Sequence, residues 1–321
     1  MPAALGHAFR RLLALPAVLV GVTLLTFLLT GLIPGDVAEE LILRSGGQPT
    51  PEAVAALRAQ LGLDDPGPVR YLRWLARVAR LDLGQSWQTG EPVGPLLLER
   101  LQATLVLTGT ALTVGVGVAL GLGTWAAARP GGLADRLALG TTLLLRCTPD
   151  FVLGFVLLYF LAVRWPVLPL TGAGTWRHLV LPALVLGLGL GATQARLLRA
   201  SLLEVLREPF IAAARARGLG RRTVLLRHAL RAALVPVVTS LGNATGFLLG
   251  GSVVVEAIFG WPGVGQLAVR AVGTRDLPVL QGYALAMATL VVVVNLAVDL
   301  SYPLLDPRIA VEGGERDATS R

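Results

Sequence analysis

The chain has 321 residues, of which 54% are hydrophobic and only 15% are charged, and its formal net charge is +8. Soluble domains carry about 25% charged residues, so this composition excludes an ordinary globular domain, a disordered chain and a disulfide scaffold, and it predicts an integral membrane protein. A positive charge is typical of the cytoplasmic loops of such proteins, and no nucleic-acid partner is expected.

Six apolar segments are long enough to cross a lipid bilayer, which takes about 20 residues in a helix. Five of them have no charge before their last residue: Leu12–Ile33, Leu101–Ala128, His178–Ala195, Ala232–Glu256 and Leu277–Val298. The sixth segment, Leu137–Val163, contains Arg146 and Asp150. We therefore predict an all-α polytopic membrane protein with six transmembrane helices.

The first apolar segment follows Arg10 and Arg11, as the apolar part of a signal peptide would. It is longer than the apolar run of about 7–15 residues in such a peptide, and no small-residue cleavage site follows it. A retained transmembrane helix is therefore expected.

Arginines predict the orientation of the six helices, because cytoplasmic loops are richer in them. Segment 196–231 has nine arginines and two acidic residues, and further arginines precede the first span and follow the second. Segment 34–100 has seven arginines and nine acidic residues. Both termini and segment 196–231 are expected in the cytoplasm, and segment 34–100 outside.

The external segment predicts a small helical cap after the first span. Thr50 is a suitable N-cap residue, Pro51 favours the first helical position, and Gly62 can end the helix. A second short helix is expected at Val69–Leu81. The chain then divides into the N-terminus with the first span (1–33), the cap (34–100), a core with five spans (101–310) and a cytoplasmic tail (311–321).

Segment 204–231, between the fourth and fifth spans, predicts a cytoplasmic helix that starts at Glu208-Pro209. Its small residues and their basic neighbours are Ala212, Ala213, Ala214, Arg215 and Arg217, and the helix breaks at Gly218. A second helical turn is expected from Thr223 to Arg231. A helix of this kind suits docking in a groove of another protein or lying on anionic lipid, and the residues leave both readings open.

A few polar residues inside the predicted spans are candidates for a transport pathway, because such groups are costly in a membrane. They are Arg146, Asp150, Gln194 and Asn243. Arg146 and Asp150 could pair at i,i+4 on one helix face, or Arg146 could extend to the membrane surface instead.

Chemistry other than transport finds little support in the residues. The three histidines are far apart and there is one cysteine, so no metal site is expected, and neither a phosphate-binding loop nor a catalytic constellation occurs. We expect no cofactor on this chain and no enzymatic activity of its own. The runs Gly115–Gly123 and Gly187–Gly191 are expected to let helices pack closely.

Two other classes of membrane protein fit the sequence less well. A secondary transporter working alone is disfavoured because no chain of acidic residues crosses the spans. A structural membrane anchor is disfavoured because six spans with polar interior groups exceed what an anchor needs.

Several motifs in a fixed order give the chain a family resemblance. The most specific are Ala214-Arg215-Ala216-Arg217-Gly218-Leu219, Arg227-His228-Ala229-Leu230-Arg231 and Val255-Glu256-Ala257-Ile258-Phe259-Gly260-Trp261-Pro262-Gly263-Val264-Gly265. Ile33-Pro34-Gly35-Asp36, Asp82-Leu83-Gly84-Gln85-Ser86 and Thr148-Pro149-Asp150-Phe151 accompany them. In this order the sequence resembles the inner-membrane permease subunits of ABC importers, in the group that carries dipeptides, oligopeptides and nickel.

The resemblance implies a transport subunit in the cell membrane of a bacterium or archaeon. It implies that segment 204–231 is a coupling loop that docks on an ATPase subunit through Ala212, Ala213, Ala214, Arg215, Arg217, Gly218 and Leu219. The loop facing a binding protein would include Glu256, Trp261, Pro262 and Gly263. The implied partners are a second homologous permease, two ATP-binding subunits and an extracytoplasmic solute-binding protein.

Three stretches suggest the cargo: segment 165–178, and Pro49-Thr50-Pro51-Glu52 and Gln194-Ala195-Arg196, which also resemble nickel and opine-metallophore permeases. Segment 165–178 is brief and resembles nickel and opine-metallophore permeases, whereas many dipeptide permeases carry a longer insertion there. We therefore expect nickel or a metal chelate as cargo, with a di- or oligopeptide as the alternative.

Overall fold

The computed structural model describes residues 2–31 and 35–305, and within them the regular secondary structure is helical. This confirms the all-α fold. The tail predicted at 311–321 lies outside the described residues.

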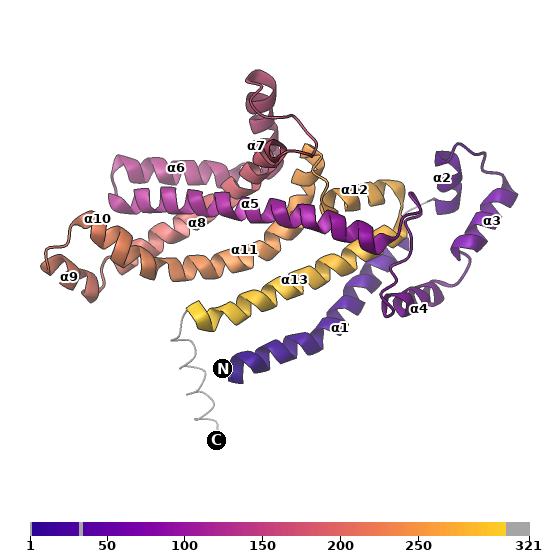
Figure 1. Ribbon diagram of the computed structural model, residues 1–321, viewed down its shortest axis with the longest axis horizontal. Helices are drawn as coiled ribbons and strands as arrows, with labels where there is room; N and C mark the ends of the chain where they lie inside the picture. Colours follow the sequence, from indigo (N-terminus) through magenta and orange to yellow (C-terminus); the bar gives the residue numbers. More distant parts are fainter. Residues whose placement is uncertain (1, 32–34, 306–321) are drawn as a thin grey trace.

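The long helices run roughly along one axis, and short helices lie at both of its ends (Figure 1). Three short helices lie at one end, called the cap end from here: α2 (Val37–Arg44), α3 (Pro51–Leu61) and α4 (Gly67–Val78). The opposite end carries α9 (Pro209–Ala216) and is called the α9 end.

Four helices are long and apolar enough to cross a membrane unbroken. They are α5 (Val93–Ala128), α8 (Trp176–Val205), the continuous helix Arg221–Phe259 and α13 (Leu277–Leu305). A fifth long helix, α1 (Pro2–Gly31), lies beside α13, and its described apolar part is Pro16–Leu29.

The helical turn predicted at Thr223–Arg231 is not a separate element. It belongs to one helix built from α10 (Arg221–Thr223), a π-helical stretch (Val224–Ala229) and α11 (Leu230–Phe259).

The segment Leu137–Val163, expected as one span, is not a single straight helix, because the chain bends sharply within it. α6 (Leu133–Cys147) and α7 (Asp150–Leu158), which continues as π-helix through Tyr159–Arg164, meet at 104°. Thr148 takes an extended conformation because the proline after it disfavours the helical region. Pro149 also has no N–H with which to continue the helical hydrogen bonds. The described residues therefore do not establish the six predicted spans.

Glycines bring α5 and α8 together at backbone distance, as the glycine-rich runs predict. A Cβ added at Gly187 would lie 2.6 Å from the Cβ of Val114 and 2.8 Å from the carbonyl oxygen of Ala111. One added at Gly191 would lie 2.6 Å from the Cβ of Val118. Small residues permit this approach, and the close contact is the main source of helix association inside a membrane.

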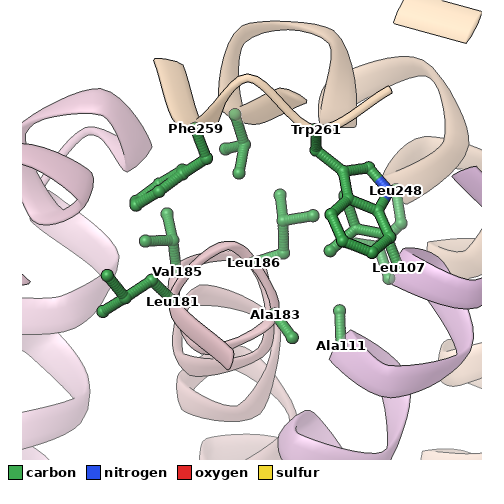
Figure 2. Packing of buried hydrophobic residues seen from close by; sticks show 10 residues of the cluster. Leu107, Ala111, Leu181, Ala183, Val185, Leu186, Leu248, Phe259 and Trp261 are labelled. Carbon is green, nitrogen blue, oxygen red and sulfur yellow. The ribbon is translucent and has the colours of Figure 1, made fainter. Parts of the chain in front are cut away.

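The largest apolar cluster fills the space between α5, α8 and α11 toward the cap end (Figure 2). Its members are Leu107, Ala111, Leu181, Ala183, Val185, Leu186, Leu248, Val255, Phe259 and Trp261. The indole of Trp261 also donates a hydrogen bond from Nε1 to the carbonyl oxygen of Ala103 at 2.9 Å, so the polar end of this side chain is satisfied inside the cluster.

The two predicted cap helices are present. In α3 the Thr50 hydroxyl accepts a hydrogen bond from the Ala53 N–H at 3.3 Å, and Gly62 ends the helix in the left-handed conformation at φ 66°. α4 covers Gly67–Val78 rather than Val69–Leu81. It begins earlier because Pro68 can occupy its first turn.

Two polar joints hold the cap to the long helices. The Tyr71 hydroxyl of α4 donates to the carbonyl oxygen of Val20 in α1 at 3.0 Å. Glu40 of α2 pairs with Arg275, which follows α12 (Val264–Thr274), at 3.1 Å.

We expect Gly187→Ala to destabilise the protein, because its Cβ meets the α5 backbone and overpacking costs about 1–3 kcal/mol. Gly117→Ala on α5 is the matched control, since no heavy atom lies within 4 Å of its Cβ position. Thermal unfolding of the two purified variants in detergent measures the effect. Equal melting temperatures would show that α5 and α8 can separate without loss.

Candidate functional site

A cavity of about 640 Å³ opens at the bend between α6 and α7. Its walls come from that bend, from α8 and from α11. All four residues that the sequence selected as pathway candidates line it: Arg146, Asp150, Gln194 and Asn243. They come from three separate stretches of the chain, and the bend is what brings the first two of them against α8.

Gln194 is the buried polar residue of this cavity. Its Nε2 donates to the hydroxyl of Ser240 on α11 at 2.9 Å. Its Oε1 is also buried and has no hydrogen-bond partner in the described part of the chain. An unfilled acceptor in a low-dielectric site is costly, and it is available to a donor that enters the cavity.

Arg146 and Asp150 do not form the predicted pair on one helix face. Arg146 ends α6 and Asp150 begins α7, so the bend separates them, and no ion pair joins them among the described residues. Asp150 instead lies against α8, where a Cβ at Gly189 would be 3.4 Å from its Oδ1. A carboxylate in the first turn of α7 also interacts favourably with the helix dipole.

An ion pair that the sequence did not reveal fixes the start of α6. Arg199 of α8 binds both carboxylate oxygens of Asp135, with Nε to Oδ1 at 2.6 Å and Nη2 to Oδ2 at 2.7 Å. The N–H of Gly131 donates to the same carboxylate at 2.8 Å. The only local signal for this ion pair was the position of Asp135 four residues after Gly131. Its partner Arg199 is 64 residues away in the sequence.

The Glu256 side chain is fully buried and joins three helices. Its Oε1 accepts from the hydroxyls of Thr104 on α5 at 2.8 Å and Ser252 on α11 at 3.0 Å. Its Oε2 accepts from the N–H groups of Gly265 at 2.8 Å and Gln266 at 3.0 Å, in the first turn of α12. A carboxylate at a helix N-terminus satisfies N–H groups that have no partner within the helix.

The loop predicted to face a binding protein is therefore largely internal. Glu256, Trp261 and Gly263 are buried, and Pro262 is half-buried. A Cβ on Gly263 would lie 2.3 Å from the Glu256 carboxylate, so the carboxylate occupies the space that a side chain would need. These residues build the joint between α11 and α12 instead of offering a contact surface.

A second buried acid ties the cap to α13. Asp276 accepts from the Ser86 hydroxyl at 2.5 Å and from the Trp87 N–H at 3.1 Å. The Asp82-Leu83-Gly84-Gln85-Ser86 motif thus ends in a residue that anchors the last part of the cap.

The middle of the predicted coupling segment forms α9, which is one short helix with two different faces. Ile211 and Ala214 pack inside the chain's own core with Leu198 and Leu202 of α8. Ala214 is thus unavailable to a partner, and its assignment to the docking face is wrong because the phase of α9 is set by Ile211.

The residues predicted for coupling that are exposed are Ala212, Ala213, Arg215, Arg217, Gly218 and Leu219. Gly218 has φ +83°, a left-handed conformation that glycine adopts without strain. Ala213 thus presents a small side chain on the outer side of α9, immediately before this turn.

Comparison with known protein families finds one that matches most of this chain. Residues 119–311 match the family model for the binding-protein-dependent transport system inner membrane component, and residues 5–108 match the model for its N-terminal part. The chain belongs to this family. The family match confirms the resemblance on which the sequence analysis relied, and it makes the chain a multi-pass inner-membrane permease subunit of an ABC importer.

Curated relatives match almost the whole chain. The glutathione transport system permease protein GsiC of Salmonella paratyphi A is 38% identical over 305 residues, which cover 95% of this chain and 99% of the relative. The probable peptide ABC transporter permease protein y4tP of Sinorhizobium fredii is 38% identical over 311 residues, covering 94% and 98%. The names of these relatives refer to peptides and glutathione, and they do not support the nickel expectation.

A solved structure shares the fold of the core. The inward-facing MetNI methionine ABC transporter matches with a TM-score of 0.56 at 22% identity, over 66% of this chain and 96% of that chain.

We expect Glu256→Gln to destabilise the joint, because an amide NH₂ would replace one oxygen that accepts hydrogen bonds from buried donors. Leaving such groups unpaired costs about 1–3 kcal/mol, and more where a charge is involved. Glu99→Gln is the control, since Glu99 is exposed on α5. Thermal unfolding in detergent should show a lower melting temperature for Glu256→Gln alone. Identical melting curves for both variants would show that the carboxylate does not hold α12.

Proposed function

We propose that the chain forms half of the pathway for di- and oligopeptides, including glutathione-like peptides, through an ABC importer. A second homologous permease would supply the other half. An extracytoplasmic binding protein would deliver the peptide, and two ATP-binding subunits would drive alternating access. One observation supports a peptide as the cargo. Relatives that are 37–38% identical over 94–96% of the chain are named as peptide or glutathione permeases.

The cavity at the bend supports a peptide as cargo by its chemistry. Arg146 and Asp150 supply one charge of each sign, which suits a zwitterion. Gln194 and Asn243 add amide groups, and the free Oε1 of Gln194 can accept from a peptide N–H. A peptide offers both termini and its own amides to such a set, so the same few side chains can bind many sequences.

In this proposal α9 transmits the movement of the ATP-binding subunits to the permease. Ile211 and Ala214 on its inner face pack against α8. A displacement of α9 by a partner bound to its exposed face would therefore also displace α8. α8 carries Gln194 and packs closely on α5. A displacement of α9 thereby reaches the cavity through two rigid helices. The arginine distribution supports a cytoplasmic α9 end and cytoplasmic termini.

The cargo is tested by uptake into proteoliposomes that contain the complete importer with its binding protein. We expect ATP-dependent uptake of labelled dipeptide or glutathione, and about tenfold or greater loss in Arg146→Gln, since hydrogen bonds to a charged group contribute about 1.5–3 kcal/mol. Arg136→Gln removes the same charge from α6 outside the cavity and should transport normally.

Uptake of nickel without peptide would overturn the cargo and restore the metal alternative. Uptake that persists without the ATP-binding subunits would identify a secondary transporter.

Orientation and docking are tested together by single cysteines at Ala55 on α3 and Ala213 on α9, in a Cys147→Ser background. Both positions are exposed. An impermeant maleimide should label Ala55→Cys from outside and Ala213→Cys only from inside, and bound ATPase subunits should protect the latter. Labelling of both from one side would reject the orientation. Full labelling of Ala213→Cys in the assembled importer would identify α9 as a lipid-facing helix.

A further inference from the structure

A second cavity, of about 440 Å³, lies at the cap end where α4 faces the ends of α1 and α13. The residues that matter for its chemistry are Phe27, Arg70, Arg73, Trp74, Arg77 and Asp82. Figure 1 shows α4 beside the end of α1, away from the cavity at the α6–α7 bend. The cavity at the cap end is thus separate from the proposed transport pathway.

The cavity is rich in positive charge. Arg70, Arg73 and Arg77 recur at helical spacing and line it from one face of α4. Arg73 pairs with Asp65 at 2.5 Å, but no described ion pair involves Arg70 or Arg77. The one acid in the wall, Asp82, accepts from the Gly84 N–H at 2.8 Å.

Arg70 is half-buried and forms no ion pair among the described residues. Burial lowers the pKa of its guanidinium and the nearby Arg58 lowers it further, while Asp65 acts in the opposite direction. An anion in the cavity would compensate for this loss of solvation.

Trp74 is independent evidence for a ligand, because its indole N–H lacks a hydrogen-bond acceptor among the described residues. Its side chain is buried and lines the cavity, and its Nε1–H has no hydrogen-bond partner among the described residues. Buried indole N–H groups usually have a partner. An acceptor from outside the chain would satisfy this donor together with Arg70 and Arg77.

The surroundings place the cavity at a membrane surface. Phe27 belongs to the apolar part of α1, and the Arg70 guanidinium lies 5.7 Å from the centre of its ring. Tyr71 packs between Phe27 and Trp74, with ring centres 5.5 and 6.1 Å away. Leu24, Leu25, Leu28 and Leu29 are exposed on the same stretch of α1. Aromatic rings at the end of an exposed apolar helix are typical of the headgroup level of a bilayer.

We propose that this cavity binds the phosphate of an anionic phospholipid, with its acyl chains against the exposed leucines of α1. Arg70 and Arg77 bind phosphate oxygens, and Trp74 Nε1 donates to one of them. A phospholipid fits better than an acidic side chain of a partner protein because it fills the basic cavity and covers the apolar flank of α1 at once. Under the orientation proposed above, the lipid belongs to the outer leaflet.

The proposal is tested by native mass spectrometry of the purified permease complex with phosphatidylglycerol added in detergent. We expect retained lipid, with about tenfold or greater loss of affinity in the double variant Arg70→Gln and Arg77→Gln, since each loses a charged hydrogen-bond donor. Trp74→Phe keeps an aromatic side chain but has no indole N–H, and should also weaken retention. Arg80→Gln removes a charge just beyond α4, outside the cavity, and should bind as the wild type does.

Three outcomes would overturn the proposal. Equal retention in wild type, Trp74→Phe and the double variant would show that the lipid binds elsewhere. Displacement of the lipid by millimolar inorganic phosphate would identify a site for the free anion. Unchanged lipid retention together with weaker binding-protein affinity in the double variant would identify a protein-docking surface. None of these results depends on the identity of the cargo.

Discussion

The arrangement of the cap end depends on one buried carboxylate, that of Glu256. It receives hydrogen bonds from α5, from its own helix α11 and from two N–H groups at the start of α12. α12 has only 11 residues, too few to be stable alone in water, and its first N–H groups lie where water is excluded. Once the carboxylate holds α12, the chain leaves it at Asp276, which binds the Ser86 segment and so fixes the base of the cap.

The cavity proposed as the transport pathway has a different physical origin, which is a close contact between two helices and a break in a third. Gly187 and Gly191 let α8 lie directly on α5, which leaves no room between them for a polar pathway. The break at Thr148 and Pro149 supplies that room instead, because α7 departs from α6 at 104° and exposes the side of α8. Arg199 and Asp135 hold the other end of α6 to α8, so the two halves of the broken segment are anchored independently.

Some of these structural features can be predicted from a few neighbouring residues in the sequence, and others cannot. Thr50, Pro51 and Gly62 specify α3 by themselves, and the glycine runs predict the contact between α5 and α8, because each effect is confined to a few neighbouring residues. Pro149 is a local signal for a break in the helix, but the size of the bend depends on what α7 packs against. The orientation of Ala214 depends on Ile211 meeting α8, and the role of Glu256 depends on Thr104, which is 152 residues away. Sequence periodicity carries no information about such distant partners.

The degree to which buried polar groups are satisfied separates supporting residues from candidate ligand contacts. Glu256 accepts hydrogen bonds from four donors and Asp135 from three, all within the chain, so both carboxylates support the fold; residue type alone gave Glu256 a different role and did not single out Asp135. Gln194 and Trp74 each retain one buried atom without a partner, and each lines a cavity. Arg100 and Thr108 also have a buried polar atom without a partner among the described residues, but they line neither cavity, so it is the combination of an unpaired atom with a cavity that favours a bound molecule at Gln194 and Trp74. The same physical argument thus points to a peptide at the bend and to a lipid phosphate beneath the cap.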